Sequence, residues 1–177
     1  MLSEDTSALP RRLKELRQEL GWSLEDLAQA IQAGSKGVIS NWEATTDRQR
    51  IPPLGTLLAL ARWYGVSLDY LVGLPGAERD SPGVRLGKAA LRERFPLEAG
   101  RLELSTPATR LRLCMEILQE TAPEAFFTTR IAAQLLLTEE RFQSMVETGN
   151  IPDSTLQRFA SVVGIPVSWF FVRVEDL

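Results

Sequence analysis

The sequence contains no histidine and a single cysteine, Cys114, among its 177 residues. Without histidine the chain lacks the side chain that most often serves as a general base or metal ligand near neutral pH. One cysteine cannot form an intramolecular disulfide or a thiolate cluster for zinc. Cys114 falls on an apolar helical stripe, so we expect a core thiol there. Paired carboxylates occur, as at Glu139 and Glu140, but no basic or glycine-rich segment accompanies them. We therefore expect no enzyme, no cofactor and no metal site.

Long hydrophobic runs are absent as well. The longest apolar segments, at 57–61 and 162–172, are broken by polar residues or proline far short of a membrane span. The first sixteen residues lack the basic and then apolar pattern of a secretion signal. A hydrophobic fraction of 44% and a charged fraction of 24% are ordinary for a globular protein. We expect a cytoplasmic protein without a membrane segment, built from one large domain or two small ones.

Apolar residues at helical spacing predict five helices in the first seventy residues. The first helix is marked by Leu9, Leu13, Leu16 and Leu20, and Gly21 ends it. Ser23 and Asp26 have the spacing of a capping box, which opens the second helix. Ser35 can cap the third helix, Pro52-Pro53 introduces the fourth, and residues 68–72 form the fifth. No strand pattern occurs, so residues 1–73 are predicted to form an all-α domain.

The span 74–106 is richer in proline, glycine and charge than the segments around it. It is predicted to be a linker that encloses one short basic helix around 84–94. The basic side chains of this helix are Arg85, Lys88, Arg92 and Arg94. We expect them to form a solvated helix face, and contact with phosphates is the alternative.

Residues 107–177 repeat the pattern of the first domain. RLKELRQEL at 12–20 matches RLRLCMEIL at 110–118, and TLLALARWYGVSLDYLV at 56–72 matches TLQRFASVVGIPVSWFF at 155–171, with Gly65 over Gly164. Between them TRIAAQLLLTEERFQSMVETG parallels the second and third helices, with Phe142 over Ile39. The sequence therefore predicts two copies of one helical unit.

One pair of differences between the two copies supports this alignment. Arg17 is replaced by Met115 and Glu43 by Val146, so both positions became apolar together. If Arg17 and Glu43 form an ion pair, the loss of one partner would leave a buried charge, whereas replacement of both is tolerable.

The order of parts in residues 9–73 resembles the Cro/C1-type helix-turn-helix family of repressors. The resemblance rests on LPRRLKELRQELG, SLEDLAQAI, the ISNWE segment and TLLALARWYGVSLDYLVG, and it covers about two-fifths of the chain. In that family the helix that corresponds to residues 35–43 lies in the major groove of DNA. The resemblance implies a DNA-binding transcriptional regulator.

The outward face of this third helix can be derived from its spacing. If Val38, Ile39 and Trp42 face the core, the residues that face outward are Lys36, Gly37, Ser40 and Asn41. An asparagine can form two hydrogen bonds with an adenine edge, and a lysine can donate to guanine or to a phosphate. The glycine admits a close approach of the backbone, at a cost in helix stability of about 0.5–1 kcal/mol relative to alanine. A plain solvated face is the alternative that the family pattern disfavours.

The chain departs from the family pattern at three places around this helix. Leu24 follows Ser23 where the family usually carries a glutamine that anchors phosphate, although the Ser23 hydroxyl and backbone N–H groups remain at this helix start. The turn before Ser35 is one residue longer than usual. The loop at 44–53 is also longer, and it offers Arg48 and Arg50 as phosphate or minor-groove contacts.

The second copy is expected to have lost contact with DNA. Glu139 and Glu140 stand where the first copy has Lys36 and Gly37, and carboxylates there would repel phosphates; at a helix start capped by Thr138 they are favourable. This copy is therefore predicted to be a degenerate helix-turn-helix unit for dimerisation or interaction. The consecutive aromatics Trp169, Phe170 and Phe171 are predicted to form an exposed dimer interface. The alternative is that the linker helix folds back and covers them.

These patterns favour a cytoplasmic, sequence-specific DNA-binding regulator. The simplest form is a repressor that binds a palindromic operator as a homodimer, with two recognition helices in successive major grooves of double-stranded DNA. Residues 1–70 hold eight Lys and Arg against nine Asp and Glu, so positive charge is at best local and affinity is expected to depend on a dimer. The rival hypothesis is an antitoxin or anti-regulator whose C-terminal domain binds a protein partner.

Overall fold

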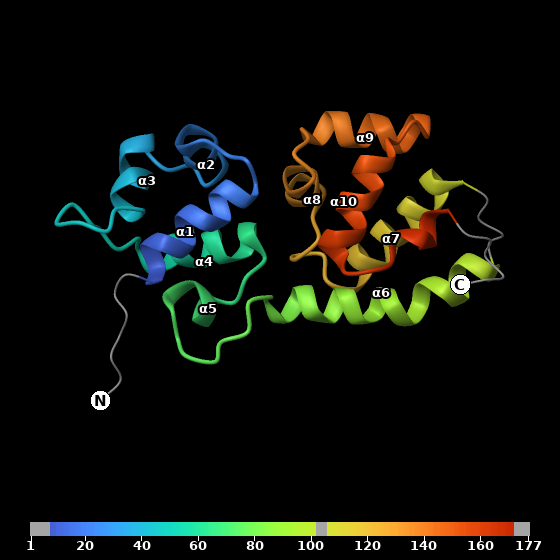
Figure 1. Cartoon of the computed structure of the whole chain (residues 1–177), viewed down its shortest axis with the longest axis horizontal. Coiled ribbons are helices and arrows are strands. Elements are labelled where there is room, and N and C mark those ends of the chain that lie inside the picture. Colours follow the sequence, from blue (N-terminus) through green and yellow to red (C-terminus); the bar gives the residue numbers. More distant parts are fainter. Residues whose placement is uncertain (1–7, 102–105, 172–177) are drawn as a thin grey trace. The chain divides into compact units, whose positions relative to one another are not determined.

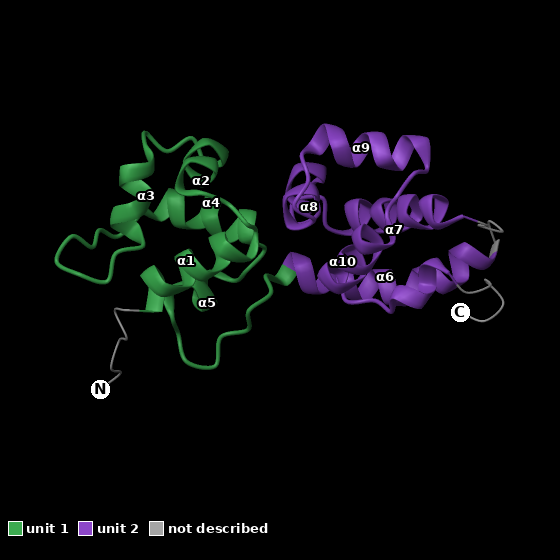
Figure 2. Ribbon diagram, turned by 45° about the horizontal axis from the view of Figure 1, so that its top comes forward, with its two compact units in different colours: residues 1–82 green, residues 83–177 purple. Residues whose placement is uncertain are grey.

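Helices account for all the regular secondary structure in the described part of the chain (Figure 1). The computed structural model describes residues 8–101 and 106–171, which confirms the predicted all-α class. The chain divides into two compact units, unit 1 at 1–82 and unit 2 at 83–177 (Figure 2). None of the helices within the described ranges is long and apolar enough to cross a membrane.

Unit 1 contains the five helices that the sequence predicts. Their bounds are α1 (Ala8–Glu19), α2 (Leu24–Ala30), α3 (Lys36–Trp42), α4 (Leu54–Tyr64) and α5 (Leu68–Val72). Each helix places at least one apolar side chain in a single core, including Leu13, Leu27, Ile39, Leu60 and Leu71. Gly65 ends α4 in the left-handed conformation with φ of 69°, which a glycine adopts without steric cost. The burial of these apolar faces is the main stabilising contribution to unit 1.

The segment 74–81 belongs to unit 1 rather than to a free linker. The Ser67 N–H donates to the carbonyl of Arg79 at 2.8 Å, and the Ser81 N–H donates to the carbonyl of Gly65 at 3.0 Å. An isolated antiparallel bridge joins Val66 to Asp80. These bonds hold the segment against the turn between α4 and α5, because buried or half-buried backbone groups need partners.

The predicted short basic helix around 84–94 is part of a longer helix, α6 (Pro82–Arg101), whose apolar face lies in the core of unit 2. Val84, Leu91, Phe95 and Ala99 are buried there. The expected linker 74–106 is therefore divided between the two units. The composition of this span indicates a linker because the charged face of α6 is wide. The four buried apolar residues at helical spacing are nevertheless enough to anchor α6 in the core of unit 2.

Two of the basic residues of α6 are engaged within unit 2. The Arg92 guanidinium donates to the carbonyl of Gly164 at 2.8 and 3.0 Å. The Arg94 guanidinium bonds the carboxylates of Glu98 at 2.7 Å and Glu120 at 2.9 Å. The side chains of Arg92 and Arg94 thus have partners within unit 2 and are not purely solvated, and contact of this face with phosphates stays an untested alternative.

Unit 2 repeats the order of unit 1 after α6. Its further elements are α7 (Pro107–Thr121), α8 (Thr128–Gln134), α9 (Glu139–Thr148), α10 (Asp153–Val163) and the 3-10 helix η1 (Val167–Phe170). The turn between α2 and α3 contains Gln32 with φ of 55°, and the turn between α8 and α9 contains Leu136 with φ of 60°. Non-glycine residues rarely adopt this conformation, so its occurrence at both turns supports the repeat. Five residues separate α2 from α3 and four separate α8 from α9, in agreement with the longer first turn.

A matched arginine contact fixes the register of the two copies. The Arg12 guanidinium donates to the carbonyl of Tyr70 and lies 4.3 Å from the centroid of its ring. The Arg110 guanidinium donates to the carbonyl of Trp169 at 2.8 Å. Arg12 pairs with Arg110 and Tyr70 with Trp169 in the sequence alignment, so both units close their first helix onto their last element in the same way.

The three consecutive aromatics do not form one exposed patch, which corrects the expected exposure of Trp169 and Phe170; a role of the triplet in a dimer interface stays a prediction. Phe170 is buried in unit 2, with its ring 6.1 Å from that of Phe159 in an edge-on arrangement. Trp169 stacks on Phe95 of α6 at 4.9 Å between ring centroids. Phe171 alone of the three is exposed, at 52%. The alternative arrangement holds for Trp169, because α6 folds back and covers it.

Candidate nucleic-acid interface

The eight residues predicted to contact DNA are all on the surface of unit 1. They lie at the start of α2, along α3 and in the loop that follows α3: Ser23, Ser35, Lys36, Gly37, Ser40, Asn41, Arg48 and Arg50. The structure therefore brings the third-helix residues onto one accessible helix. The contact of each of these residues with DNA stays a prediction.

The buried side of α3 is narrower than its sequence predicts. Ile39 and Trp42 are in the core, whereas Val38 is 36% exposed. The expectation that Val38 faces inward is corrected. A helix of seven residues spans two turns, and α3 packs against α2 along a stripe that only two side chains fill. Val38 is beside that stripe and therefore remains at the edge of the core. An exposed valine on the outward side is suited to apolar contact with a thymine methyl group.

The two serines at the helix starts differ in their capping bonds. The Ser23 hydroxyl accepts from the Asp26 N–H at 3.1 Å, and the Asp26 carboxylate accepts from the Ser23 N–H at 2.7 Å, which completes the predicted capping box. Hydrogen bonds from the Ser23 side chain and then from its backbone lower the pKa of Asp26. Ser35 is at the N-cap of α3 but its side chain makes no capping bond. The Ser35 hydroxyl can therefore bond another partner, such as a phosphate.

The loop after α3 is tied to that helix through its backbone. The Arg50 N–H donates to the Asn41 carbonyl at 3.0 Å, and the Gln49 N–H donates to the Thr46 carbonyl at 2.8 Å. The Arg50 guanidinium bonds the Gln49 carbonyl at 3.0 Å, and the side chains of both Arg48 and Arg50 are exposed. The loop thus keeps two cations near the carboxyl end of α3.

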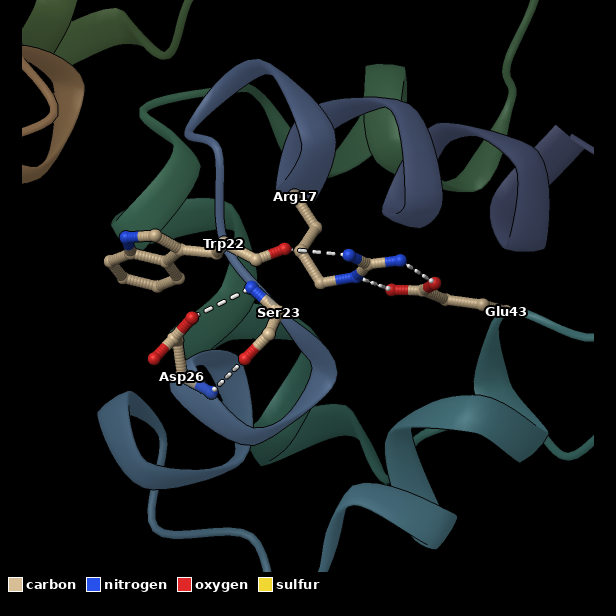
Figure 3. A network of polar contacts seen from close by, with 5 residues as sticks. All are labelled: Arg17, Trp22, Ser23, Asp26 and Glu43. Atoms are coloured by element: carbon tan, nitrogen blue, oxygen red, sulfur yellow. Dashed lines mark hydrogen bonds and ion pairs between the residues drawn. The ribbon is translucent and has the colours of Figure 1, made fainter.

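A bidentate ion pair fixes α3 to the rest of unit 1 (Figure 3). The Arg17 guanidinium on α1 bonds the Glu43 carboxylate, directly after α3, at 2.7 and 2.8 Å. A third N–H of Arg17 donates to the Trp22 carbonyl at 2.6 Å, just before the capping box of α2. Only 11% of the Arg17 side chain and 6% of the Glu43 side chain are exposed. One guanidinium therefore joins α1, the start of α2 and the end of α3.

The electrostatic environment of this ion pair is that of a partly buried charge cluster. The hydrogen bond with Glu43 raises the pKa of Arg17. Burial raises the pKa of the nearby Tyr64 hydroxyl, and the Glu43 charge adds to this shift. Within the described residues the Tyr64 hydroxyl has no hydrogen-bond partner. Because the pair is nearly removed from solvent, it adds little to the surface charge of the site. Its contribution is to hold α3 in position.

The sequence predicted the Arg17–Glu43 pair but missed the Trp22 carbonyl and the Arg12 contact. A sequence signal for the Arg12 contact was available, since Arg12 and Arg110 occupy matched positions in the two copies. The Trp22 carbonyl carries no side-chain signal, so no sequence pattern could identify it as an acceptor.

The corresponding face of unit 2 is acidic and partly engaged. The Glu139 carboxylate accepts hydrogen bonds from the Thr129 hydroxyl and from the Gln143 amide, the latter at 3.2 Å. The Thr138 hydroxyl caps α9 by accepting from the Arg141 N–H at 3.3 Å. Carboxylates in the first turn of α9 stabilise that helix and would repel a phosphate at the same place.

Comparison with known proteins assigns the first unit. Residues 13–71 match the helix-turn-helix family, a range that contains α2, α3 and the intervening turn. The HTH-type transcriptional regulator ImmR of Bacillus subtilis is 39% identical over 66 residues, which are 37% of this chain and 49% of ImmR. The uncharacterized HTH-type transcriptional regulator YobD of the same organism is 35% identical over 83 residues, 47% of this chain and 67% of YobD.

The matches extend over about half of ImmR and two-thirds of YobD. No solved structure is significantly similar to the chain. The family match coincides with the unit whose turn, ion pair and exposed third helix are described above. The chain belongs to the Cro/C1-type helix-turn-helix family of transcriptional regulators through its N-terminal unit.

Proposed function

We propose that this protein is a cytoplasmic, sequence-specific transcriptional repressor that inserts α3 into the major groove of its operator. The supporting observation is the combination of a polar, exposed face on α3 with a buried ion pair that fixes the end of the same helix. Asn41 and Ser40 offer hydrogen bonds to base edges, and Lys36 offers a charge to guanine or phosphate. A helix held in one orientation can present such groups without losing conformational entropy on binding.

Backbone contacts in this proposal come from both sides of α3. Arg48 and Arg50 in the following loop neutralise phosphates, and the hydroxyls of Ser23 and Ser35 bond phosphate oxygens. Gly37 allows α3 to approach the duplex closely because it has no side chain. Unit 1 itself has room for a Cβ at this position, which would meet only the Ser35 hydroxyl, at 3.6 Å. These contacts position the helix but carry no sequence information of their own.

The proposal is tested on an operator obtained by genomic pull-down of DNA fragments bound to the full chain. Asn41→Ala should lower affinity for that operator by about 1–3 kcal/mol, measured by fluorescence anisotropy, with little change on random DNA. Lys36→Ala should weaken binding and reduce the salt dependence if the lysine meets a phosphate. The matched control is Ser144→Ala on α9, which occupies the position of Asn41 in unit 2. Parent-like affinity in both unit 1 variants would exclude α3 as the recognition helix.

We further propose that the repressor acts as a homodimer on a palindromic operator. Unit 1 has no net positive charge in its sequence, so two copies bound to one site would supply the affinity that one copy lacks. Phe171 is the member of the aromatic triplet that remains available to a second chain, while Phe170 and most of Trp169 are used within unit 2.

Sedimentation of the full chain at micromolar concentration tests this part of the proposal. Phe171→Glu should shift the dimer toward monomer and lower operator affinity, because it adds a charge to an apolar contact. Leu54→Glu, at an exposed leucine of unit 1, is the comparison variant of the same chemistry. A monomeric parent, or a dimer unaffected by Phe171→Glu, would contradict the assigned interface. Purification of a stoichiometric protein partner in place of a second copy would favour the antitoxin or anti-regulator hypothesis.

A further inference from the structure

Unit 2 contains a hollow that opens to solvent between α7, α8 and α9. Its volume is about 240 Å³. The apolar part of its lining comes from Met115 on α7 and from Phe142 and Val146 on α9. A space of this size holds a group comparable to one large amino-acid side chain and is smaller than a site for a drug-sized ligand.

The hollow lies where unit 1 keeps its ion pair. Met115 occupies the position of Arg17, and Val146 occupies the position of Glu43 in the register fixed by the matched arginine and turn contacts. In unit 1 the long guanidinium side chain and the carboxylate fill the space between the first and third helices. Methionine and valine are shorter in total, so the repeated fold leaves the space open to a molecule with the same features as the missing arginine: an apolar stem and a cationic head.

Acidic groups stand at the edge of this hollow. Glu116 and Glu147 both line it and are exposed, and their carboxylates have no hydrogen bond or ion pair within the described residues. The cation on the lining, Arg112, directs its guanidinium to the carbonyls of Val146 and Glu147 at 3.1 Å each. Its Nε and Nη2 are thereby engaged by the carboxyl end of α9, and the two carboxylates outnumber this one cation at the edge of the hollow.

We propose that the hollow binds a small organic cation, a primary ammonium or guanidinium group on an apolar body the size of a side chain. The apolar body would cover Met115 and Val146, and its removal from water supplies most of the binding free energy. The cationic head would lie toward Glu116 and Glu147, which select it over neutral molecules of the same shape. Binding at this place is independent of DNA and of the proposed repressor activity.

The methionines provide a direct measurement on the full chain. Of the three methionines, Met115 lines the hollow, Met145 is on α9 outside the lining, and Met1 is outside the described residues. With ¹³C-methyl methionine, titration with 2-phenylethylammonium should shift the Met115 methyl resonance in a saturable way and the Met145 resonance much less. The resonances are assigned with Met115→Leu. Absence of any Met115 shift at millimolar ligand, the range expected for a molecule this small, would overturn the proposal.

The charge preference is tested with a neutral probe of the same shape, 2-phenylethanol. The ammonium probe should bind about three- to tenfold more tightly than the alcohol, and added salt should reduce the ratio because the carboxylates are exposed. In the double variant Glu116→Gln, Glu147→Gln the ratio should approach one while the affinity for the alcohol stays unchanged. Equal binding of the two probes to the parent would overturn the assignment of a cation site.

A second variant fills the hollow with the groups that unit 1 uses. Met115→Arg combined with Val146→Glu should abolish binding of both probes, measured by ligand-observed saturation-transfer NMR. A circular dichroism melting curve checks that this variant is folded. If it is unfolded, the glutamine variants still decide the proposal, since they retain the apolar lining and the Met115 methyl group. Retained binding in the folded Arg–Glu variant would place the ligand elsewhere.

Discussion

The buried ion pair of unit 1 can be tested with the substitutions that unit 2 already contains. Arg17→Met should leave the Glu43 carboxylate uncompensated in a site where only 6% of that side chain is exposed. Glu43→Val should leave the Arg17 guanidinium in the same situation. Removal of one partner of a buried pair costs about 3–5 kcal/mol. A unit of this length has a total stability of roughly 4–12 kcal/mol, so each single variant should be near the limit of folding.

The double variant Arg17→Met, Glu43→Val should be far more stable than the sum of the two single changes predicts. It removes both charges and replaces them with the apolar pair that the same position tolerates as Met115 and Val146. The remaining cost is about 1–3 kcal/mol, because the Trp22 carbonyl loses its donor. The coupling between the two substitutions should therefore amount to several kcal/mol.

Urea unfolding followed by tryptophan fluorescence is a suitable assay. Three of the four tryptophans, Trp22, Trp42 and Trp63, are in unit 1, so the signal reports mainly on that unit. The matched control is the substitution of Arg11, whose ion pair with Glu15 is exposed and should cost less than about 1 kcal/mol. Additive single and double variants would refute the view that the two charges exist for one another. A double variant that folds but binds the operator weakly would show that the pair orients α3.

Further predictions concern a close helix contact, a helix cap and the single thiol. Gly87→Ala should destabilise unit 2 by about 1–3 kcal/mol in a thermal melt, because its Cβ would lie 2.2 Å from the buried ring of Phe126, whereas Gly55→Ala, with open space around it, should be neutral or stabilising. Asp26→Ala should be less stable than the parent at pH 7. The folded-state pKa of Asp26 is lowered, so this difference in stability should fade as the pH falls below about 4 and through the folded value. Parallel urea titrations of parent and variant measure the difference. Cys114 is fully buried and burial raises its pKa, so a thiol reagent should label it only after denaturation; rapid labelling of the native protein would contradict its place in the core.

The helices and ion pair of unit 1 could be predicted because their signals are local or duplicated. The capping box of Ser23 and Asp26 depends on residues three apart, and helix spacing places Leu13 and Leu16 in the core. The Arg17–Glu43 pair is distant in sequence, but the second copy exposed it through a correlated change. A repeat thus acts as a comparison within one chain, with each copy showing what the other can replace.

The errors arise where a residue's environment is set by tertiary packing. Val38 is adjacent to a buried stripe, and the tilt of α3 against α2 decides on which side of the boundary it lies. Phe95 and Trp169 are 74 positions apart in the sequence and carry no pairing signal, so the coverage of the aromatic triplet by α6 could not be read from either segment. Composition also concealed the full length of α6 and its packing in unit 2, because its charged residues are numerous and its buried ones are few.

A comparison of the two units distinguishes the features that the fold requires from those that contact with DNA is proposed to require. Both keep the positive-φ turn before the third helix, the glycine at the end of the fourth, and the arginine that bonds the last element. These shared features stabilise the helical unit in either sequence. The two units differ at the outward face of the third helix, where unit 1 has Lys36 and unit 2 has Glu139. They also differ in the pair of residues that joins this helix to the first helix. A charged pair fixes the helix that is proposed to read DNA, and an open apolar contact takes its place in unit 2, which is expected to have lost contact with DNA. The ion pair is therefore better explained by the orientation of α3 than by stability, since an apolar pair satisfies the same fold.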